Sequence, residues 1–110
     1  MGWYHEYAMI PLIRDRQQAI AKLCQRYAVR RLELFGSAAD GRFDPATSDL
    51  DFLVAFGPHQ ELNAFHQFFR FREALSHLLE RQVDLVDATA MRNPYFIAQV
   101  NRSREPLYAA

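Results

Sequence analysis

The chain has 110 residues, of which 50% are hydrophobic and 24% are charged. This length is typical of one domain, so we expect residues 1–110 to form a single domain with little room for an appended module. Thirteen Lys and Arg balance thirteen Asp and Glu. A surface without excess positive charge argues against a protein that coats long nucleic acids.

The remaining composition favours a cytoplasmic protein. No apolar stretch approaches the ~18 residues that a membrane span needs. The N-terminus, which begins Met1-Gly2-Trp3, lacks the basic region and apolar stretch of a signal peptide. The only cysteine, Cys24, excludes an intramolecular disulfide framework and is typical of a reducing compartment.

The first half of the chain predicts a helix followed by two strands. Apolar residues recur at helical spacing over residues 10–27, with a gap midway. Residues 30–35 alternate between apolar and polar, as a half-buried strand does, and Gly36 ends this strand. Turn-forming residues over 37–47 predict a loop with one helical turn. Residues 49–56 predict the second strand.

The second half adds two helices and one or two further strands. Apolar residues over 61–81 predict a long amphipathic helix, and residues 83–86 predict a short strand. Asn93 and Pro94 are typical of a helix start, with proline at the first helical position. Residues 105–108 predict a short edge strand. This order predicts an α/β (α+β) fold, in which helices pack on a small mixed sheet of three to four strands.

Two acids on one strand carry the first chemical signal. Successive strand residues point to opposite faces, so Asp49 and Asp51 share the face opposite the apolar residues Leu50, Phe52, Val54 and Phe56. Their Cα atoms would lie ~6.5 Å apart, close enough for both carboxylates to bind one cation or a pair of cations. In isolation, two such acids are also typical of a solvated strand face. Without a cation they would repel each other and raise each other's pKa.

A turn and a third acid strengthen the metal interpretation. Gly36 and Ser37 follow the first strand, twelve residues before Asp49 counted from Ser37. Glycine permits close backbone approach, and a serine hydroxyl beside backbone N–H groups suits a phosphate oxygen. If the strand carrying Asp84 lies beside the second strand, this carboxylate reaches the same face. It could then accept a proton from an attacking hydroxyl.

The run Phe35–Gly41 (FGSAADG) followed by Ser48–Val54 (SDLDFLV) resembles the signature of polymerase-beta-type nucleotidyltransferases. The similarity is greatest to the minimal nucleotidyltransferase (MNT) group, and Asp84 stands where that group carries its third acid. The resemblance implies a polymerase-beta-like fold. It also implies that Asp49, Asp51 and Asp84 are catalytic and hold Mg²⁺, with two ions expected, and that Gly36 and Ser37 bind the nucleotide.

The implied reaction transfers a nucleoside monophosphate, AMP from ATP, to a hydroxyl with release of pyrophosphate. Members of the minimal group often act as antitoxins that AMPylate a tyrosine of a HEPN-domain RNase toxin. A partner protein of this kind is therefore expected, because the chain has no further domain to hold an acceptor. One residue departs from the resemblance: Asp40 stands before Gly41, where the group usually has arginine. Arg42 is a candidate replacement.

Two other functions remain open. The first is a non-catalytic antitoxin that neutralises its partner by covering it, consistent with Asp40 and with surplus phenylalanines over 61–81 that suit a partner or self-association. The second is a nucleotidyltransferase that modifies an antibiotic or another small molecule. That activity needs an acceptor pocket, which we expect a chain of this length to enclose only as an oligomer.

Overall fold

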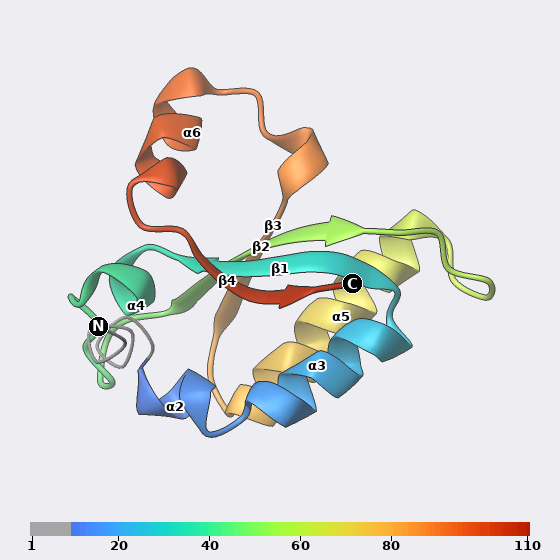
Figure 1. The fold of residues 1–110 in the computed structure, drawn as a ribbon, viewed down its shortest axis with the longest axis horizontal. Coiled ribbons are helices and arrows are strands. Elements are labelled where there is room, and N and C mark those ends of the chain that lie inside the picture. Colours follow the sequence, from blue (N-terminus) through green and yellow to red (C-terminus); the bar gives the residue numbers. More distant parts are fainter. Residues whose placement is uncertain (1–9) are drawn as a thin grey trace.

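A four-stranded sheet separates two groups of helices (Figure 1). The structure is a computed structural model that describes residues 10–110, so the expectation of no signal peptide lies outside the described residues. Its helices are α2 (Pro11–Arg14), α3 (Gln17–Arg26), α4 (Ser37–Asp40), α5 (Ala64–Leu79) and α6 (Pro94–Asn101), with a 3₁₀ turn, η1 (Ala88–Ala90). Its strands are β1 (Val29–Phe35), β2 (Leu50–Phe56), β3 (Val83–Asp87) and β4 (Glu105–Ala109). No helix within residues 10–110 combines the length and apolar character that spanning a bilayer takes.

The sheet is mixed, as the sequence predicted. Its strands lie in the order β3-β2-β1-β4. β1 pairs antiparallel with both β2 and β4, whereas β2 and β3 are parallel. The long α5 connects the two parallel strands, because a parallel pair needs a crossover that brings the chain back to the same end of the sheet. The predicted edge strand near residue 105 is confirmed as β4.

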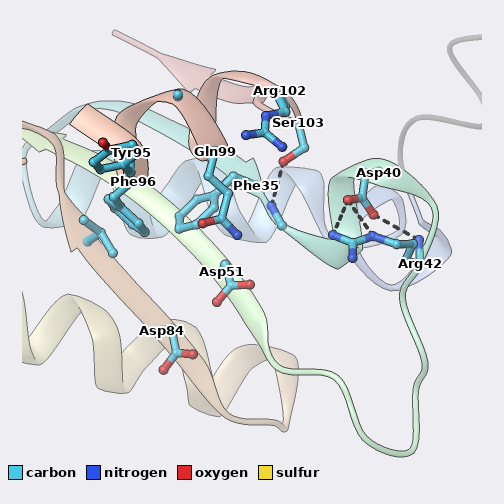
Figure 2. Close-up of a pocket in the computed structure, with 13 residues that line it drawn as sticks. Phe35, Asp40, Arg42, Asp51, Asp84, Tyr95, Phe96, Gln99, Arg102 and Ser103 are labelled. Carbon is cyan, nitrogen blue, oxygen red and sulfur yellow. Dashed lines mark hydrogen bonds and ion pairs between the residues drawn. The ribbon is translucent and has the colours of Figure 1, made fainter. Parts of the chain in front are cut away.

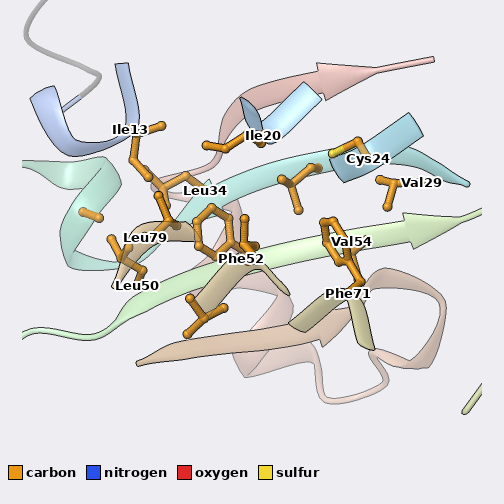
Figure 3. Packing of buried hydrophobic residues seen from close by; sticks show 14 residues of the cluster. Ile13, Ile20, Cys24, Val29, Leu34, Leu50, Phe52, Val54, Phe71 and Leu79 are labelled. Carbon is orange, nitrogen blue, oxygen red and sulfur yellow. The ribbon is translucent and has the colours of Figure 1, made fainter. Parts of the chain in front are cut away.

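Alternation along β2 divides the interior into two clusters. Phe52 and Val54 point to one face, where they pack with Phe71 and other buried residues of α2, α3 and α5 (Figure 3). Leu53 points to the other face and packs with Phe35 and Val100, which brings α6 onto that face. The larger cluster holds most of the apolar area and so supplies most of the stabilisation. The smaller one positions α6 above the polar end of β2.

Two predicted helix boundaries differ from the structure. The helix expected over 10–27 is two helices, α2 and α3, separated at Asp15 and Arg16. The stretch between the buried Ile13 and Ile20 is largely polar, so little packing holds the helix together there. The helix expected over 61–81 begins only at Ala64, because the side chain of Asn63 accepts a hydrogen bond from the His66 amide and caps it.

A buried ion pair ties the C-terminal strand to the sheet, and the sequence analysis did not find it. Glu33 in β1 is 6% exposed and receives two hydrogen bonds from Arg104, at 2.5 Å from Nη2 and 3.2 Å from Nε. Bidentate arginine–carboxylate pairs are among the stronger polar contacts in proteins. Arg104 directly precedes β4, so this pair fixes the turn between α6 and β4 against β1.

We expect Glu33→Ala to lower the free energy of unfolding by about 2 kcal/mol, because it leaves the partly buried Arg104 guanidinium without its carboxylate partner and with only its hydrogen bond to Asn101. Urea denaturation at pH 7 measures this loss. Glu73→Ala, which removes an exposed carboxylate from α5, is the matched control and should change the free energy of unfolding by less than ~0.5 kcal/mol. Equal stability of the two variants would contradict a structural role for the pair.

Candidate active site

Asp51 and Asp84 lie side by side on neighbouring strands. The parallel register of β2 and β3 places Asp51 directly opposite Asp84, and adjacent strands are only ~4.8 Å apart. Asp51 is half-buried, and burial is the main reason that its pKa rises from 3.8 to about 6. The charge of Asp84, hydrogen bonding with Asp84 and the charge of Asp49 raise the pKa of Asp51 further. The two carboxylates therefore meet, as the sequence predicted.

Asp49 occupies a different position from the one expected. The sequence placed it within the second strand, but β2 begins at Leu50, and Asp49 is an exposed residue of the segment before it. Within the described range, no three His, Cys, Asp or Glu side chains are grouped closely enough to hold a metal ion. Asp49 is still close enough for its charge to act on Asp51. The structure thus brings Asp51 and Asp84 together, whereas Asp49 lies in the segment just before β2.

The donor set of the pair suits a hard divalent cation. Carboxylate oxygens are the ligands that Mg²⁺ takes in proteins. The raised pKa of Asp51 reflects repulsion and desolvation that a bound cation would offset. Both acids therefore fit the role of cation ligands.

The Gly36 turn approaches Asp51 so closely that only glycine fits. Phe35, the register partner of Asp51 in β1, leads directly into Gly36, which has φ +73° and ψ −151°. A Cβ atom at Gly36 would lie 2.5 Å from Oδ2 of Asp51. The Gly36 amide donates a hydrogen bond to Oγ of Ser103 at 3.0 Å, so this N–H, which the sequence analysis took to be free for a phosphate, already has a partner. Ser37 follows as the first residue of α4.

A cleft of about 1060 Å³ lies above the acid pair (Figure 2). The sheet side contributes Gly36, Asp51 and Asp84, and α6 with the turn after it forms the opposite side. Phe96 packs edge-on against Phe35 at 6.0 Å between ring centroids. The residues lining the cleft are Phe35, Gly36, Asp40, Arg42, Asp51, Asp84, Val86, Tyr95, Phe96, Ala98, Gln99, Arg102 and Ser103. Asp49 and Ser37 are not among them.

Asp40 and Arg42 form an ion pair within the cleft. The Arg42 guanidinium donates to Oδ2 of Asp40 from Nε at 2.8 Å and from Nη2 at 2.6 Å (Figure 2). Hydrogen bonding from Arg42 lowers the pKa of Asp40, and the same contact raises the pKa of Arg42. Arg42 therefore does reach the cleft, but its charge is directed at Asp40.

The sequence analysis missed the side of the cleft that α6 provides. Tyr95, Gln99 and Arg102 line the cleft, and their spacing of four and three residues places them on one helix face. That spacing was a usable signal, because it gives the helix a polar and aromatic stripe beside its buried Val100. Ser103, which bonds to Gly36, had no such signal, because only the folded chain brings it to residue 36.

Comparison with known proteins gives a consistent result. The family model described as "Nucleotidyltransferase domain" matches residues 16–106. A curated protein of Methanocaldococcus jannaschii, named "Putative protein adenylyltransferase", is 38% identical over 73 residues, which are 66% of this chain and 70% of that protein. A solved structure named "putative minimal nucleotidyltransferase" is 36% identical, with a TM-score of 0.71, over 89% of this chain and 97% of that one.

A more distant neighbour is similar in fold. The structure of a tri-AMPylated HEPN toxin in complex with an MNT antitoxin, from Shewanella oneidensis, matches with a TM-score of 0.61 and 22% identity, over 88% of this chain and 72% of that one. At this identity the likeness shows the fold alone. The family model spans most of the described chain and includes the Gly36 turn and both paired acids. This chain therefore belongs to the nucleotidyltransferase domain family, as a minimal nucleotidyltransferase.

Proposed function

We propose that this protein transfers AMP from ATP to a hydroxyl group in a Mg²⁺-dependent reaction centred on Asp51 and Asp84. One observation carries the proposal: the two carboxylates lie opposite each other in the β2–β3 register, in a cleft bounded by the Gly36 turn. Neither acid forms an ion pair with a described arginine, lysine or histidine, so both are available for a cation. The raised pKa of Asp51 supports this assignment.

The chemistry follows from the positions of these residues. The acceptor oxygen attacks the α-phosphorus, the bond from that phosphorus to the bridging β-phosphate oxygen breaks, and pyrophosphate leaves. Asp84, the more exposed acid, would accept the hydroxyl proton. Phosphate oxygens would contact the Gly36-Ser37 turn, where the Gly36 amide binds one of them only by giving up its hydrogen bond to Ser103. Asp51 and Asp84, joined by Asp49, would hold the two expected Mg²⁺ ions. When bound, these ions neutralise negative charge on the phosphates.

We further propose that the acceptor is a tyrosine of a partner protein, a HEPN-domain toxin, and that the chain acts as its antitoxin in the cytoplasm. The elements of residues 10–110 all belong to one sheet and its covering helices, which leaves no second module there to hold an acceptor. The name of the S. oneidensis neighbour, an MNT antitoxin with an AMPylated HEPN toxin, supports this partner class. In this proposal residues 1–110 act as one nucleotidyltransferase domain.

The test is label transfer. The chain is incubated with ATP labelled on the α-phosphate, Mg²⁺ and the protein encoded by the adjacent reading frame, and we expect label on a tyrosine of that protein. Asp49→Ala should stop the transfer, because it removes an acid next to Asp51. Asp15→Ala, which removes an exposed acid outside the cleft, should not. Undiminished transfer by Asp49→Ala would remove Asp49 from the site, whereas undiminished transfer by Asp51→Ala or Asp84→Ala would show that the paired acids do not carry the reaction.

A specific surface favours a second candidate function, neutralisation by covering the partner. Phe65 and Phe69 on α5 are 65% and 40% exposed, and their rings lie 4.7 Å apart between centroids. Exposed aromatic pairs of this kind are typical of binding surfaces. If covering is sufficient, a chain lacking both Asp49 and Asp51 still neutralises the toxin in cells, whereas Phe65→Glu with Phe69→Glu does not. The opposite pattern supports the transferase.

A further inference from the structure

We propose that Arg102 is the cation of the cleft that binds the phosphate chain of the nucleotide, an assignment that rests on the proposed function. The cleft is lined by three carboxylates, from Asp40, Asp51 and Asp84, and by two guanidinium groups, from Arg42 and Arg102. A nucleoside triphosphate is strongly anionic, so a cleft with this lining needs positive charge directed at the ligand. The question is which arginine supplies it.

Arg42 is committed to another group. Its guanidinium donates twice to Oδ2 of Asp40, and its backbone amide donates to Oδ1 of the same residue at 3.1 Å. The pair is nearly neutral as a unit, because the carboxylate cancels the charge of the guanidinium. A phosphate that recruited Arg42 would have to break this contact and would then face the uncompensated Asp40 carboxylate.

Arg102 has no such commitment. Among the described residues, none of its side-chain atoms forms an ion pair or hydrogen bond with an acid. It is exposed, stands at the end of α6 and lines the cleft on the side opposite the sheet (Figure 2). Of the two arginines in the cleft, it is therefore the one whose guanidinium can turn to a ligand without losing a carboxylate partner.

The backbone around Arg102 is held on both sides, although its side chain is free. Ser103 accepts a hydrogen bond from the Gly36 amide at 3.0 Å, and Arg104 is paired with the buried Glu33. These two contacts keep the turn after α6 against the turn after β1, so Arg102 stays at the edge of the cleft next to Gly36. A preorganised backbone lowers the entropy cost of presenting a charged side chain to a ligand.

The chemistry of arginine fits this role. A guanidinium donates two parallel hydrogen bonds to phosphate oxygens and stays charged at every physiological pH. A divalent cation on Asp51 and Asp84 would neutralise part of the phosphate charge from the sheet side. Arg102 would act on the remaining charge from the α6 side, so the phosphate chain would lie between the two. Arg102 is thus a binding and positioning residue, distinct from the two acids.

The experiment compares three ligands by calorimetry in the presence of Mg²⁺: ATP, inorganic tripolyphosphate and adenosine. Arg102→Ala should weaken binding of ATP and of tripolyphosphate by about 10- to 100-fold, the range for one charge-assisted contact, and leave adenosine binding unchanged. Arg102→Lys should recover part of the loss, since lysine keeps the charge but not the two-pronged geometry. Arg70→Ala, which removes an exposed arginine of α5 outside the cleft, is the matched control and should change no affinity.

Several results would overturn the assignment of Arg102. These are ATP affinity in Arg102→Ala within twofold of wild type, an equal loss of adenosine affinity, or no binding of either polyphosphate by the wild type. If AMP transfer depends on Asp51 but the affinity for ATP does not change in Arg102→Ala, the assignment of Arg102 is wrong and the proposed function stands. Conversely, ATP binding that depends on Arg102, without transfer to any protein or small molecule, would retain the assignment and overturn the proposed function.

Discussion

The Asp51→Asn variant is expected to lose AMP transfer and, at the same time, to become more stable than the wild type at pH 7. Asparagine has nearly the same shape, but it is a weaker ligand for a divalent cation and carries no charge opposite Asp84. We expect the transfer rate to fall about a thousandfold, equivalent to about 4 kcal/mol of transition-state stabilisation. Removing a charge that is half-buried and that is repelled by Asp84 should raise the free energy of unfolding by about 1 kcal/mol after solvent screening.

The pH dependence of this stability difference has a definite sign. The pKa of Asp51 is raised from 3.8 to about 6 in the folded chain. The folded state therefore keeps a proton that the unfolded state has already released, and stability falls as pH rises from about 4 through about 6. This loss of folding stability is complete once the pH is well above 6, and it is absent below about pH 4. Asp51→Asn has no such proton, so the two proteins should differ at pH 8 and converge near pH 4.

Thermal denaturation in EDTA at several pH values measures this difference, and label transfer measures the activity. Near pH 8 the melting temperature of Asp51→Asn should be several degrees higher, about 4–8 °C per kcal/mol for a domain of this size. Asp15→Asn is the control, because Asp15 is exposed and, among residues 10–110, forms an ion pair only with Arg14 at the surface. Equal melting temperatures for wild type and Asp51→Asn at pH 8 would show that neither burial nor Asp84 destabilises the charge of Asp51 in the folded chain.

Gly36→Ala is the second change with a large expected effect. The backbone at Gly36, with φ +73° and ψ −151°, lies in a region that is essentially restricted to glycine. The new Cβ would also lie 2.5 Å from Oδ2 of Asp51, so the carboxylate or the turn must move. We expect a loss of about 2 kcal/mol in the free energy of unfolding and a loss of transfer greater than about 100-fold, because an ångström-scale displacement of a reacting group is costly.

The matched control is Gly41→Ala at the other end of α4. Gly41 also has positive φ, +87°, but a Cβ there meets no atom within 4 Å. This variant should lose about 1 kcal/mol of stability from backbone strain and retain transfer activity within about threefold. Urea denaturation and label transfer compare the two variants. Similar loss of activity in both would mean that strain, rather than displacement of Asp51, accounts for the effect of Gly36→Ala.

The positions of Asp51 and Asp84 were predicted only in part from the local sequence pattern. The apolar alternation in residues 50–56 correctly predicted a strand and placed Asp51 on the face opposite Phe52 and Val54. The burial of the second face, where Leu53 packs with Phe35 and Val100, was not predicted. The expectation for Asp84 needed a further assumption, that the third predicted strand lies beside the second. The structure confirms it, because α5 returns the chain so that β3 pairs parallel with β2. The predicted start of this strand, at Asp49, was one residue too early, since β2 begins at Leu50.

Local signals located most of the elements as well. The predicted helical turn after Ser37 is α4, and the predicted helix start at Asn93 is confirmed, where the Asn93 side chain accepts a hydrogen bond from the Tyr95 amide. Asp87 caps η1 by accepting from the Thr89 amide at 2.9 Å. Each of these features depends on neighbours within a few residues, and therefore on interactions that are visible in a short stretch of sequence.

By itself, the sequence specified the element types, the mixed sheet and the identity of the acids and the glycine turn, because side-chain periodicity and capping act over short distances along the chain. The folded chain alone decided that Ser103 occupies the Gly36 amide, that Arg104 pairs with Glu33 and that Arg42 is bound to Asp40 while Arg102 is not. The first two contacts join residues 67 and 71 positions apart. Which of the two arginines can bind a phosphate depends on whether its side chain already contacts a carboxylate, and that is decided by three-dimensional packing and charge.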